Sequence, residues 1–193
     1  LANVVLAVET DELGISAGLQ DRVAQVYQGL VYMDFAEVIM EKQSYGDYEY
    51  LDFDLLPDLY IAFKADLAEG SEKVHGVYRS KYKNKDENFW TAIPKWIELT
   101  ERVKISLRTH KTDDIGVLLN ENFDIRKTVQ SVSDGNIEMI ETARKTGASA
   151  KFTGSGGAII GTYPNELVFD RLVRSLSATR VEVIKPEIAG PVE

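Results

Sequence analysis

Three glycines within four positions mark a stretch of this chain whose backbone could come very close to another group. The stretch runs Lys151-Phe-Thr-Gly-Ser-Gly-Gly-Ala158 and continues into an apolar, strand-like run. Glycine permits positive φ and has no Cβ, which suits such a close approach. The spacing differs from the G-x-G-x-x-G of a dinucleotide fold, and no Gly-Lys-Ser/Thr closes it as in a Walker A loop. On pattern alone the stretch is either a tight hairpin turn or one wall of a ligand site.

Polar side chains gather at a second place, near the start of the chain. Gln20, Asp21 and Arg22 follow a short loop that contains Gly18, so an amide, a carboxylate and a guanidinium are presented close together. Asp21 also falls in the first turn of an expected helix, where the dipole favours a carboxylate and where aspartate often caps the backbone. Glu9 precedes this group among other acidic residues, in the pattern of a solvated side chain. Spacing alone does not choose between these roles.

The composition excludes several classes of function. The formal net charge of −9 argues against nucleic acid as a partner, because a phosphate-binding surface needs a basic excess. The sequence contains no cysteine, which excludes a cysteine nucleophile and a thiolate metal site and fits a cytoplasmic location. It has no run of about 18 apolar residues, so we expect no membrane span. His75 and His110 lie far apart without further ligands at zinc spacing, so we expect surface or helix residues there.

The elements that must position these groups fall into two parts. In the first part, apolar spacing predicts a helix capped by Gly14, a second helix stopped by Gly29, and two strands, over residues 2–13, 23–27, 30–35 and 45–53. Pro57 ends the preceding element, and a strongly β-prone run at residues 59–63 follows it. We therefore place a domain junction there, between residues 1–57 and residues 58–193.

The second part alternates strands and helices. Helical patterns cover residues 71–82, 88–109, 112–129, 134–145 and 165–177, and strand patterns cover residues 59–63, 150–153, 158–163 and 180–184. We expect Asp134 to cap its helix, and the helix at 88–109 to turn an apolar stripe to the core: Ile93, Trp96, Ile97, Val103 and Leu107. With the extra helices treated as an insertion, the order is βαββαβ, the pattern of ferredoxin-like domains, and the fold class is α+β.

Several segments closely resemble segments of plant-type glucuronokinases, members of the GHMP superfamily of small-molecule kinases. The longest runs from Glu9 through Gly-Leu-Gln-Asp-Arg22 to Phe35, and the glycine stretch matches as well. Shorter matches follow in the family's order at Lys73-Val-His75, Asn122-Phe-Asp-Ile-Arg126 and Asn136-Ile-Glu-Met139. Gly-Leu-Gln-Asp and the glycine stretch together are typical of the superfamily, although bacterial heptose kinases share a similar Gly-x-Gln-Asp.

The resemblance implies a role for each group. Asp21 would be the superfamily's catalytic aspartate, which accepts or orients the proton of the attacking sugar hydroxyl. Glu9 would help to hold Mg²⁺. The third superfamily motif, a glycine turn that packs against the loop holding the phosphates of ATP, would be Gly154, Ser155, Gly156 and Gly157. Phosphoryl transfer asks the protein mainly for positioning and charge stabilisation, which such a set supplies.

One part of the superfamily pattern is not in this sequence. The nucleotide phosphate loop, a Pro-x-x-x-Gly-Leu-Ser-Ser-Ser-Ala-like stretch at a helix start, should precede Leu1. Helix-start amides hold the triphosphate, so we expect residues 1–193 alone not to be a competent kinase. The resemblance thus implies a GHMP kinase C-terminal domain at residues 58–193, preceded by the tail of the N-terminal α/β domain. The missing remainder of that domain would be a partner.

The expected reaction is phosphorylation of glucuronate to its 1-phosphate by ATP. Gly18 and Gln20 would contact the sugar beside Asp21. Either Arg22 or Arg126 would pair with the sugar's carboxylate, since arginine forms bidentate contacts with carboxylates, but a solvated or internally paired arginine is an equal alternative. The competing functions are a kinase for heptose phosphate or galactose, and a non-catalytic ferredoxin-like binding module.

Overall fold

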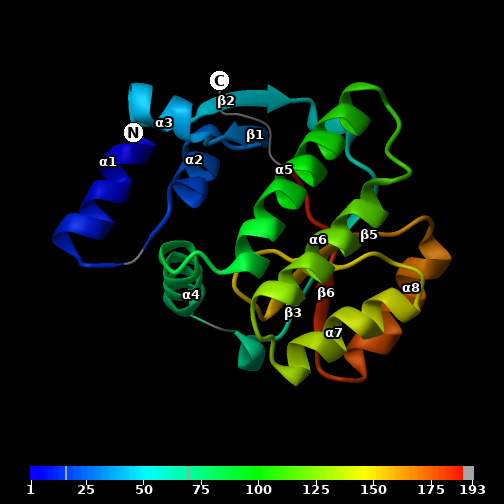
Figure 1. Cartoon of the computed structure of the whole chain (residues 1–193). Helices are drawn as coiled ribbons and strands as arrows, with labels where there is room; N and C mark the ends of the chain where they lie inside the picture. Colours follow the sequence, from blue (N-terminus) through cyan, green and yellow to red (C-terminus); the bar gives the residue numbers. More distant parts are fainter. Residues whose placement is uncertain (16, 69, 189–193) are drawn as a thin grey trace. The chain divides into compact units, whose positions relative to one another are not determined.

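The computed structural model describes residues 1–15, 17–68 and 70–188. Within them the chain forms two compact units, whose helices and strands are labelled in Figure 1: unit 1 comprises Leu1–Leu55 with Glu187 and Ile188, and unit 2 comprises Leu56–Pro186. The last five residues of the second domain expected from the sequence lie outside the described residues. No helix in the described ranges is both long enough and apolar enough to cross a bilayer.

Unit 1 combines short helices with a two-stranded sheet. Its elements are α1 (Ala2–Ala7), a π-helical turn (Val8–Glu12), α2 (Leu19–Tyr27), β1 (Leu30–Asp34), α3 (Glu37–Gln43) and β2 (Asp47–Leu51). The two strands pair antiparallel, with Leu30 opposite Leu51. α1 packs against α2, and Val23 of α2 is completely buried. This packing brings the helical turn that follows α1 close to the start of α2.

Unit 1 differs from the sequence prediction in three places. The helix expected over residues 2–13 is α-helical only to Ala7 and continues as the π-helical turn, with Gly14 beyond its end at a φ of +64°. The second strand is shorter than residues 45–53. α3 was not predicted, because it contains no buried residue and its Val38 is exposed, so it carries little apolar periodicity.

Unit 2 is built on a four-stranded antiparallel sheet in the order β4-β5-β3-β6. The strands are β3 (Leu59–Phe63), β4 (Lys151–Phe152), β5 (Ala158–Thr162) and β6 (Glu182–Ile184). β3 is central: Ile61 lies opposite Ile160 of β5 on one side and opposite Ile184 of β6 on the other. Because helices follow β3 and β5, the predicted βαββαβ order is confirmed, with additional helices in the first connection.

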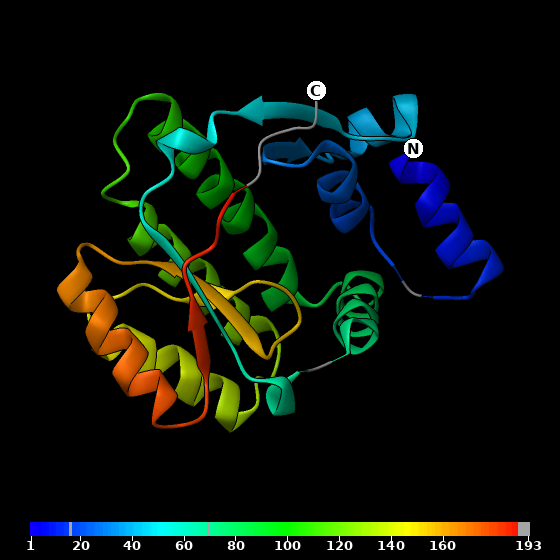
Figure 2. The same ribbon diagram turned by 180° about the vertical axis from the view of Figure 1, so that it is seen from behind.

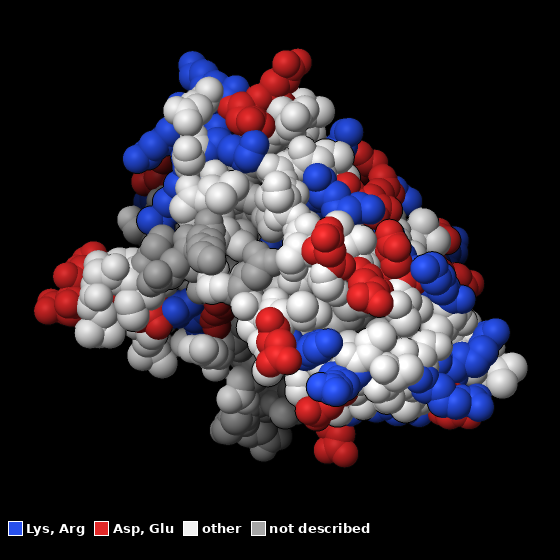
Figure 3. Space-filling view, turned by 90° about the horizontal axis from the view of Figure 1, so that it is seen from below, with Lys and Arg blue, Asp and Glu red and all other residues white. Residues whose placement is uncertain are grey.

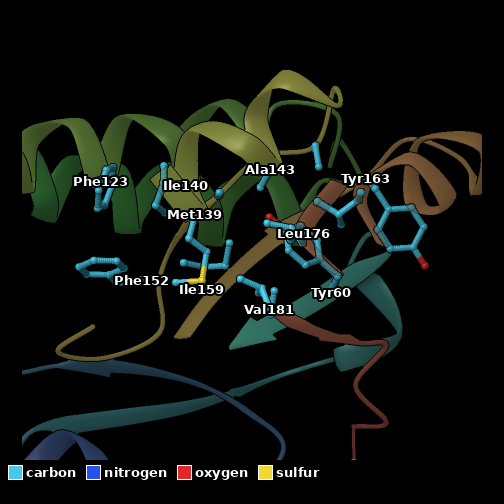
Figure 4. Close-up of a cluster of buried hydrophobic side chains, with 14 of the residues drawn as sticks. Tyr60, Phe123, Met139, Ile140, Ala143, Phe152, Ile159, Tyr163, Leu176 and Val181 are labelled. Carbon is cyan, nitrogen blue, oxygen red and sulfur yellow. The ribbon is translucent and has the colours of Figure 1, made fainter. Parts of the chain in front are cut away.

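The helices of unit 2 are α4 (Ser71–Lys83), α5 (Glu87–Arg108), α6 (Ile115–Val129), α7 (Asp134–Lys145) and α8 (Glu166–Ser177). Side chains of α6, α7 and α8 pack in the core against one face of the sheet. α5 packs along α6, α7 packs against α8, and α6 also contacts β4 and β5. Figure 2 shows the strands in front of these helices, and Figure 4 shows the core between the two layers. Both layers contribute fully buried side chains, including Tyr60, Phe123, Ile140, Ile159, Leu172 and Leu176. This core fixes the hairpin of β4 and β5 beneath the helices.

Two expectations for unit 2 were wrong. α7 begins at Asp134 itself, and Ser133 holds the cap position before it in an extended conformation. In α5, Leu107 is buried as expected, but Ile97 is 59% exposed. Ile93 and Trp96 of the expected stripe are partly buried against the cluster of Phe89, Ala92 and Val129, so Ile97 is the member of the stripe that departs from the prediction.

Candidate active site

Asp21 lies in the first turn of α2, as predicted. Gly18 holds the cap position of this helix in an extended conformation, and no side chain of the described residues forms a cap hydrogen bond there. Asp21 is therefore not a capping aspartate, so helix capping does not explain an aspartate at this position. Its side chain is 73% exposed, so a ligand can reach the carboxylate. Gln20, next to it, is also exposed.

One guanidinium joins Asp21 to Glu9. Arg22 forms an ion pair with Glu9, and its Nη1 lies 3.3 Å from Asp21 Oδ2 and 3.5 Å from the carbonyl oxygen of Gly18. The side chains of Arg22 and Glu9 are only 14% and 24% exposed, so the solvated position suggested by the pattern around Glu9 is wrong. The hydrogen bond to Glu9 raises the pKa of Arg22, with burial acting in the opposite direction. The cluster is therefore held together by charge.

These carboxylates fit the metal site that the resemblance implies. Glu9 and Asp21 contact the same guanidinium, and carboxylate oxygens are preferred ligands of Mg²⁺. Across the described residues, no group of three or more acidic or histidine side chains could hold a metal. Because Mg²⁺ is often held by one or two carboxylates, with waters or substrate phosphates at its other positions, this pair fits such a metal.

The glycine stretch forms the turn between β4 and β5, so its backbone is a hairpin. Thr153 N donates to Ala158 O at 3.1 Å and closes the turn. Gly157 has a φ of +79°, and a Cβ there would lie 2.6 Å from the Cα of Ala68. Its carbonyl oxygen accepts a hydrogen bond from Lys64 N at 2.8 Å. Packing inside unit 2 therefore requires glycine at position 157.

The other end of the same turn is open. A Cβ on Gly154 would find no atom of the described residues within 4 Å apart from its chain neighbours, and its φ lies outside the left-handed range. Gly156 is intermediate, since its Cβ would lie 3.1 Å from Asn136 Nδ2, and Ser155 is half-buried. The fold of unit 2 therefore does not explain glycine at position 154, where the absence of a side chain leaves room for a ligand.

Asn136 of α7 fixes the turn, a role that the sequence did not assign to it. Its side chain is completely buried and accepts a hydrogen bond from Gly157 N at 2.9 Å. It donates to Leu67 O at 3.1 Å and to Ser133 Oγ at 2.9 Å. The available signal was an asparagine on the buried side of an amphipathic helix, since a buried amide must find partners.

Replacing Asn136 by Ala is expected to lower the free energy of unfolding by about 1–3 kcal/mol, because it leaves the buried Gly157 N–H and Leu67 carbonyl without this partner. Ser133→Ala removes only the outer hydrogen bond of the same network and should cost less than about 1 kcal/mol. Urea denaturation of both variants checks the difference. Equal losses of unfolding free energy in the two variants would contradict the assignment of Asn136 as the residue that fixes the turn.

Arg126 of α6 holds the open end of the turn. Its Nη1 donates to Gly154 O at 2.8 Å, and its guanidinium lies 5.0 Å from the centre of the Phe152 ring. The guanidinium thus joins α6 to the residues on both sides of Thr153. Its role in substrate binding stays a prediction.

Lys151, the first residue of β4, lies close to Arg126 and donates from Nζ to Phe152 O at 2.9 Å. Burial, and to a lesser extent the charge of Arg126, lowers the pKa of Lys151 to about 8. The turn is thus flanked by two cationic side chains whose mutual repulsion is limited by the hydrogen bonds that each donates.

This pKa implies a pH-dependent stability. An unfolded lysine titrates near pH 10.4, so between about pH 8 and pH 10.4 the unfolded chain binds more protons than the folded chain. Stability from this group therefore rises with pH over that range and is constant below it. We expect the unfolding free energy of the wild type to increase relative to Lys151→Met from pH 8 to pH 10. A difference in unfolding free energy between wild type and Lys151→Met that stays constant from pH 8 to pH 10 would contradict the lowered pKa of Lys151.

Two curated plant proteins are similar to this chain over most of its length. The chain is 43% identical over 166 residues to probable glucuronokinase 2 of Arabidopsis thaliana, and 43% identical over 165 residues to glucuronokinase 1 of the same plant. This chain is a relative of the glucuronokinases. Each match covers 84% of the chain and 45% of the relative, so the chain spans about half the length of these proteins. No family model matches the chain.

Solved structures of small-molecule kinases share the fold. Galactokinase of Lactococcus lactis, in complex with galactose, matches with a TM-score of 0.72 at 15% identity, over 98% of this chain and 59% of that one. Mevalonate kinase of L. major, in complex with R-mevalonate, matches with a TM-score of 0.68 at 18% identity, over 91% and 56% of the two chains. Both are GHMP-family kinases, so the expected fold class is confirmed.

Proposed function

We propose that the protein containing this chain is an ATP-dependent kinase that phosphorylates glucuronate, or a related sugar acid, to the 1-phosphate. The 43% identity to two glucuronokinases over 84% of the chain carries this proposal. The fold shared with a galactokinase and a mevalonate kinase supports phosphoryl transfer to a small molecule.

Asp21 is the proposed catalytic base. Its exposed carboxylate accepts the proton of the sugar hydroxyl as that oxygen bonds to the γ-phosphorus of ATP and the bond to the departing ADP oxygen breaks. Glu9 would help to hold Mg²⁺, which when bound neutralises charge on the transferred phosphoryl group. The glycine turn, from Gly154 to Gly157, would pack against the loop that holds the phosphates of ATP. The open space at Gly154 supports this placement.

The proposal assigns residues 1–57 to the tail of the N-terminal kinase domain and residues 58–193 to the C-terminal domain. Unit 1 exposes large apolar side chains at its start, at Leu1 before α1, Val4 of α1 and Val8 of the π-helical turn. Such a surface is typical of a site that another part of a protein covers. We propose that the rest of the N-terminal domain covers it and supplies the phosphate loop, so that residues 1–193 alone do not suffice for catalysis.

The proposed partners are small molecules, the sugar acid and ATP, in a cytoplasmic setting. On the face in Figure 3, which lies below the view of Figure 1, Lys and Arg side chains are interspersed with Asp and Glu. Charges of opposite sign on this face offset one another, and the net charge of the chain is −9. These features support neither nucleic acid nor an anionic membrane surface as a partner.

Arg22 is the proposed partner of the sugar's carboxylate, and Gly18 and Gln20 are proposed as further contacts of the sugar. Replacing Arg22 by Met should raise the KM for glucuronate by about 10-fold or more, because a charged hydrogen-bonded pair is lost. The KM for ATP should change by less than about 2-fold. Steady-state kinetics of the full-length protein measure both, and Arg126→Met tests the second arginine. Equal increases in both KM values would argue against the assignment.

A substrate panel on the full-length protein tests the proposed function. Glucuronate, galacturonate, galactose and a heptose phosphate are each supplied with ATP and Mg²⁺, and ADP release is measured. We expect the highest kcat/KM for glucuronate. Preference for galactose or a heptose phosphate would replace the sugar acid by that substrate. Absence of ADP release with every sugar would favour the non-catalytic binding module.

A further inference from the structure

The guanidinium of Arg22 lies between the two carboxylates to which the proposed function gives the base and the metal. Its ion pair with Glu9 is largely shielded from solvent, and its Nη1 lies 3.3 Å from Asp21 Oδ2. All three residues belong to unit 1, so this arrangement is complete within one compact unit. One guanidinium thus contacts two carboxylates.

The net charge of these three side chains is negative, which disfavours the binding of a sugar acid. Two carboxylates and one guanidinium leave one negative charge, which repels an incoming carboxylate. A divalent cation bound at Glu9 reverses the sign of this net charge and leaves one positive charge. Charge balance therefore makes the binding of the metal and the binding of the sugar acid favourable to each other.

The contacts of Glu9 give a second, steric reason why binding of the metal should favour binding of the sugar acid. Arginine presents a planar fork of donors that pairs well with one carboxylate at a time. In this structure Nη2 of Arg22 pairs with Oε2 of Glu9, which has no solvent-exposed surface, and Nη1 faces Asp21. A metal ion that binds this oxygen must displace the guanidinium of Arg22. The released guanidinium then needs another carboxylate, because its charge is otherwise left partly desolvated.

We propose that Arg22 exchanges partners, pairing with Glu9 before the metal binds and with the carboxylate of the sugar acid afterwards, so that Mg²⁺ and the sugar acid bind with positive coupling. This inference rests on the proposed function and adds to it the residue that recognises the sugar's carboxylate and the condition under which it becomes available. Because coupling is reciprocal, the sugar acid also strengthens the binding of Mg²⁺.

Calorimetric titration of the full-length protein tests the coupling without turnover. Glucuronate, and glucose as an analogue without the carboxylate, are each titrated in Mg²⁺ and in EDTA, with no nucleotide present. We expect Mg²⁺ to lower the Kd of glucuronate by at least about 5-fold, as is usual for coupled sites, and to change the Kd of glucose by less than about 2-fold.

Two variants locate the effect. Glu9→Gln removes one negative charge and the ion pair, so glucuronate should bind in EDTA about as tightly as it binds the wild type in Mg²⁺, and Mg²⁺ should add little. Glu12→Gln makes the same chemical change at an exposed position of the same π-helical turn and should keep the wild-type coupling. Thermal unfolding of both variants verifies that they are folded, and the wild-type comparison stands without either.

Equal Kd values for glucuronate in Mg²⁺ and in EDTA would overturn the inference, and so would weaker binding of glucuronate by Glu9→Gln in EDTA. In both cases the proposed function stands if the same preparation phosphorylates glucuronate with ATP. A wild-type protein that neither binds nor phosphorylates glucuronate would remove the proposed function and the inference together.

Discussion

Asp21→Asn in the full-length protein is expected to lower kcat for glucuronate phosphorylation by about 10²- to 10⁴-fold, the range usual for loss of a general base. Asparagine keeps the size of the side chain but cannot accept the proton of the attacking hydroxyl. Because Asp21 is 73% exposed and does not cap α2, the variant should unfold at nearly the wild-type temperature. Stopped assays of ADP release, with a melting curve, measure both quantities.

Asp170→Asn is the matched control for this prediction. Asp170 is an exposed residue of α8 whose backbone carbonyl accepts a hydrogen bond from Arg174 Nε, so changing its side chain to an amide should leave kcat unchanged. A value of kcat for Asp21→Asn within about 10-fold of the wild type would contradict the assignment of Asp21 as the base.

Gly157→Ala is expected to lower the free energy of unfolding by about 2–5 kcal/mol. The new Cβ would lie 2.6 Å from the Cα and 2.7 Å from the backbone nitrogen of Ala68, and alanine would have to adopt a φ of +79°. A left-handed conformation and an overpacked contact each cost about 1–3 kcal/mol, and backbone atoms cannot move aside as a flexible side chain can. Chemical denaturation of the variant gives the loss.

Gly154→Ala provides the contrast within the same turn. Its Cβ would meet no atom of the described residues within 4 Å beyond its chain neighbours, so stability should stay within about 0.5 kcal/mol of the wild type. If the turn packs beside bound nucleotide as proposed, the same methyl group should still raise the KM for ATP. Equal destabilisation by the two substitutions would contradict the description of the turn as packed at Gly157 and open at Gly154.

Local sequence was enough to predict the elements that carry strong local signals. The strand Leu59–Phe63 was predicted with its bounds, because a β-prone run follows Pro57 and alternates buried and half-buried residues. The helix Asp134–Lys145 was also predicted with its bounds, because Gly147, at a φ of +97°, stops it. The order of these elements then predicted the ferredoxin-like sheet, which the strand pairing confirms.

The contacts at the candidate site could not be predicted in the same way. Glu9 and Arg22 meet only because a π-helical turn follows α1 and because α1 packs on α2, and neither feature has a period that sequence reveals. From the four-residue pattern of the turn alone, Gly154 and Gly157 would be given the same structural role. Their difference depends on Ala68, which is far from the turn in sequence.

The hydrogen bonds of Asn136 also bear on when the turn acquires its structure. This side chain joins Gly157, 21 residues away, to Leu67, 69 residues away in the opposite direction. Contacts between distant segments form slowly during folding, because chain entropy is lost before they stabilise the structure. The turn therefore reaches its native geometry only after β3, α7 and the hairpin have come together. The Gly157 end of the turn is thus ordered through contacts with distant segments and not by the three glycines themselves.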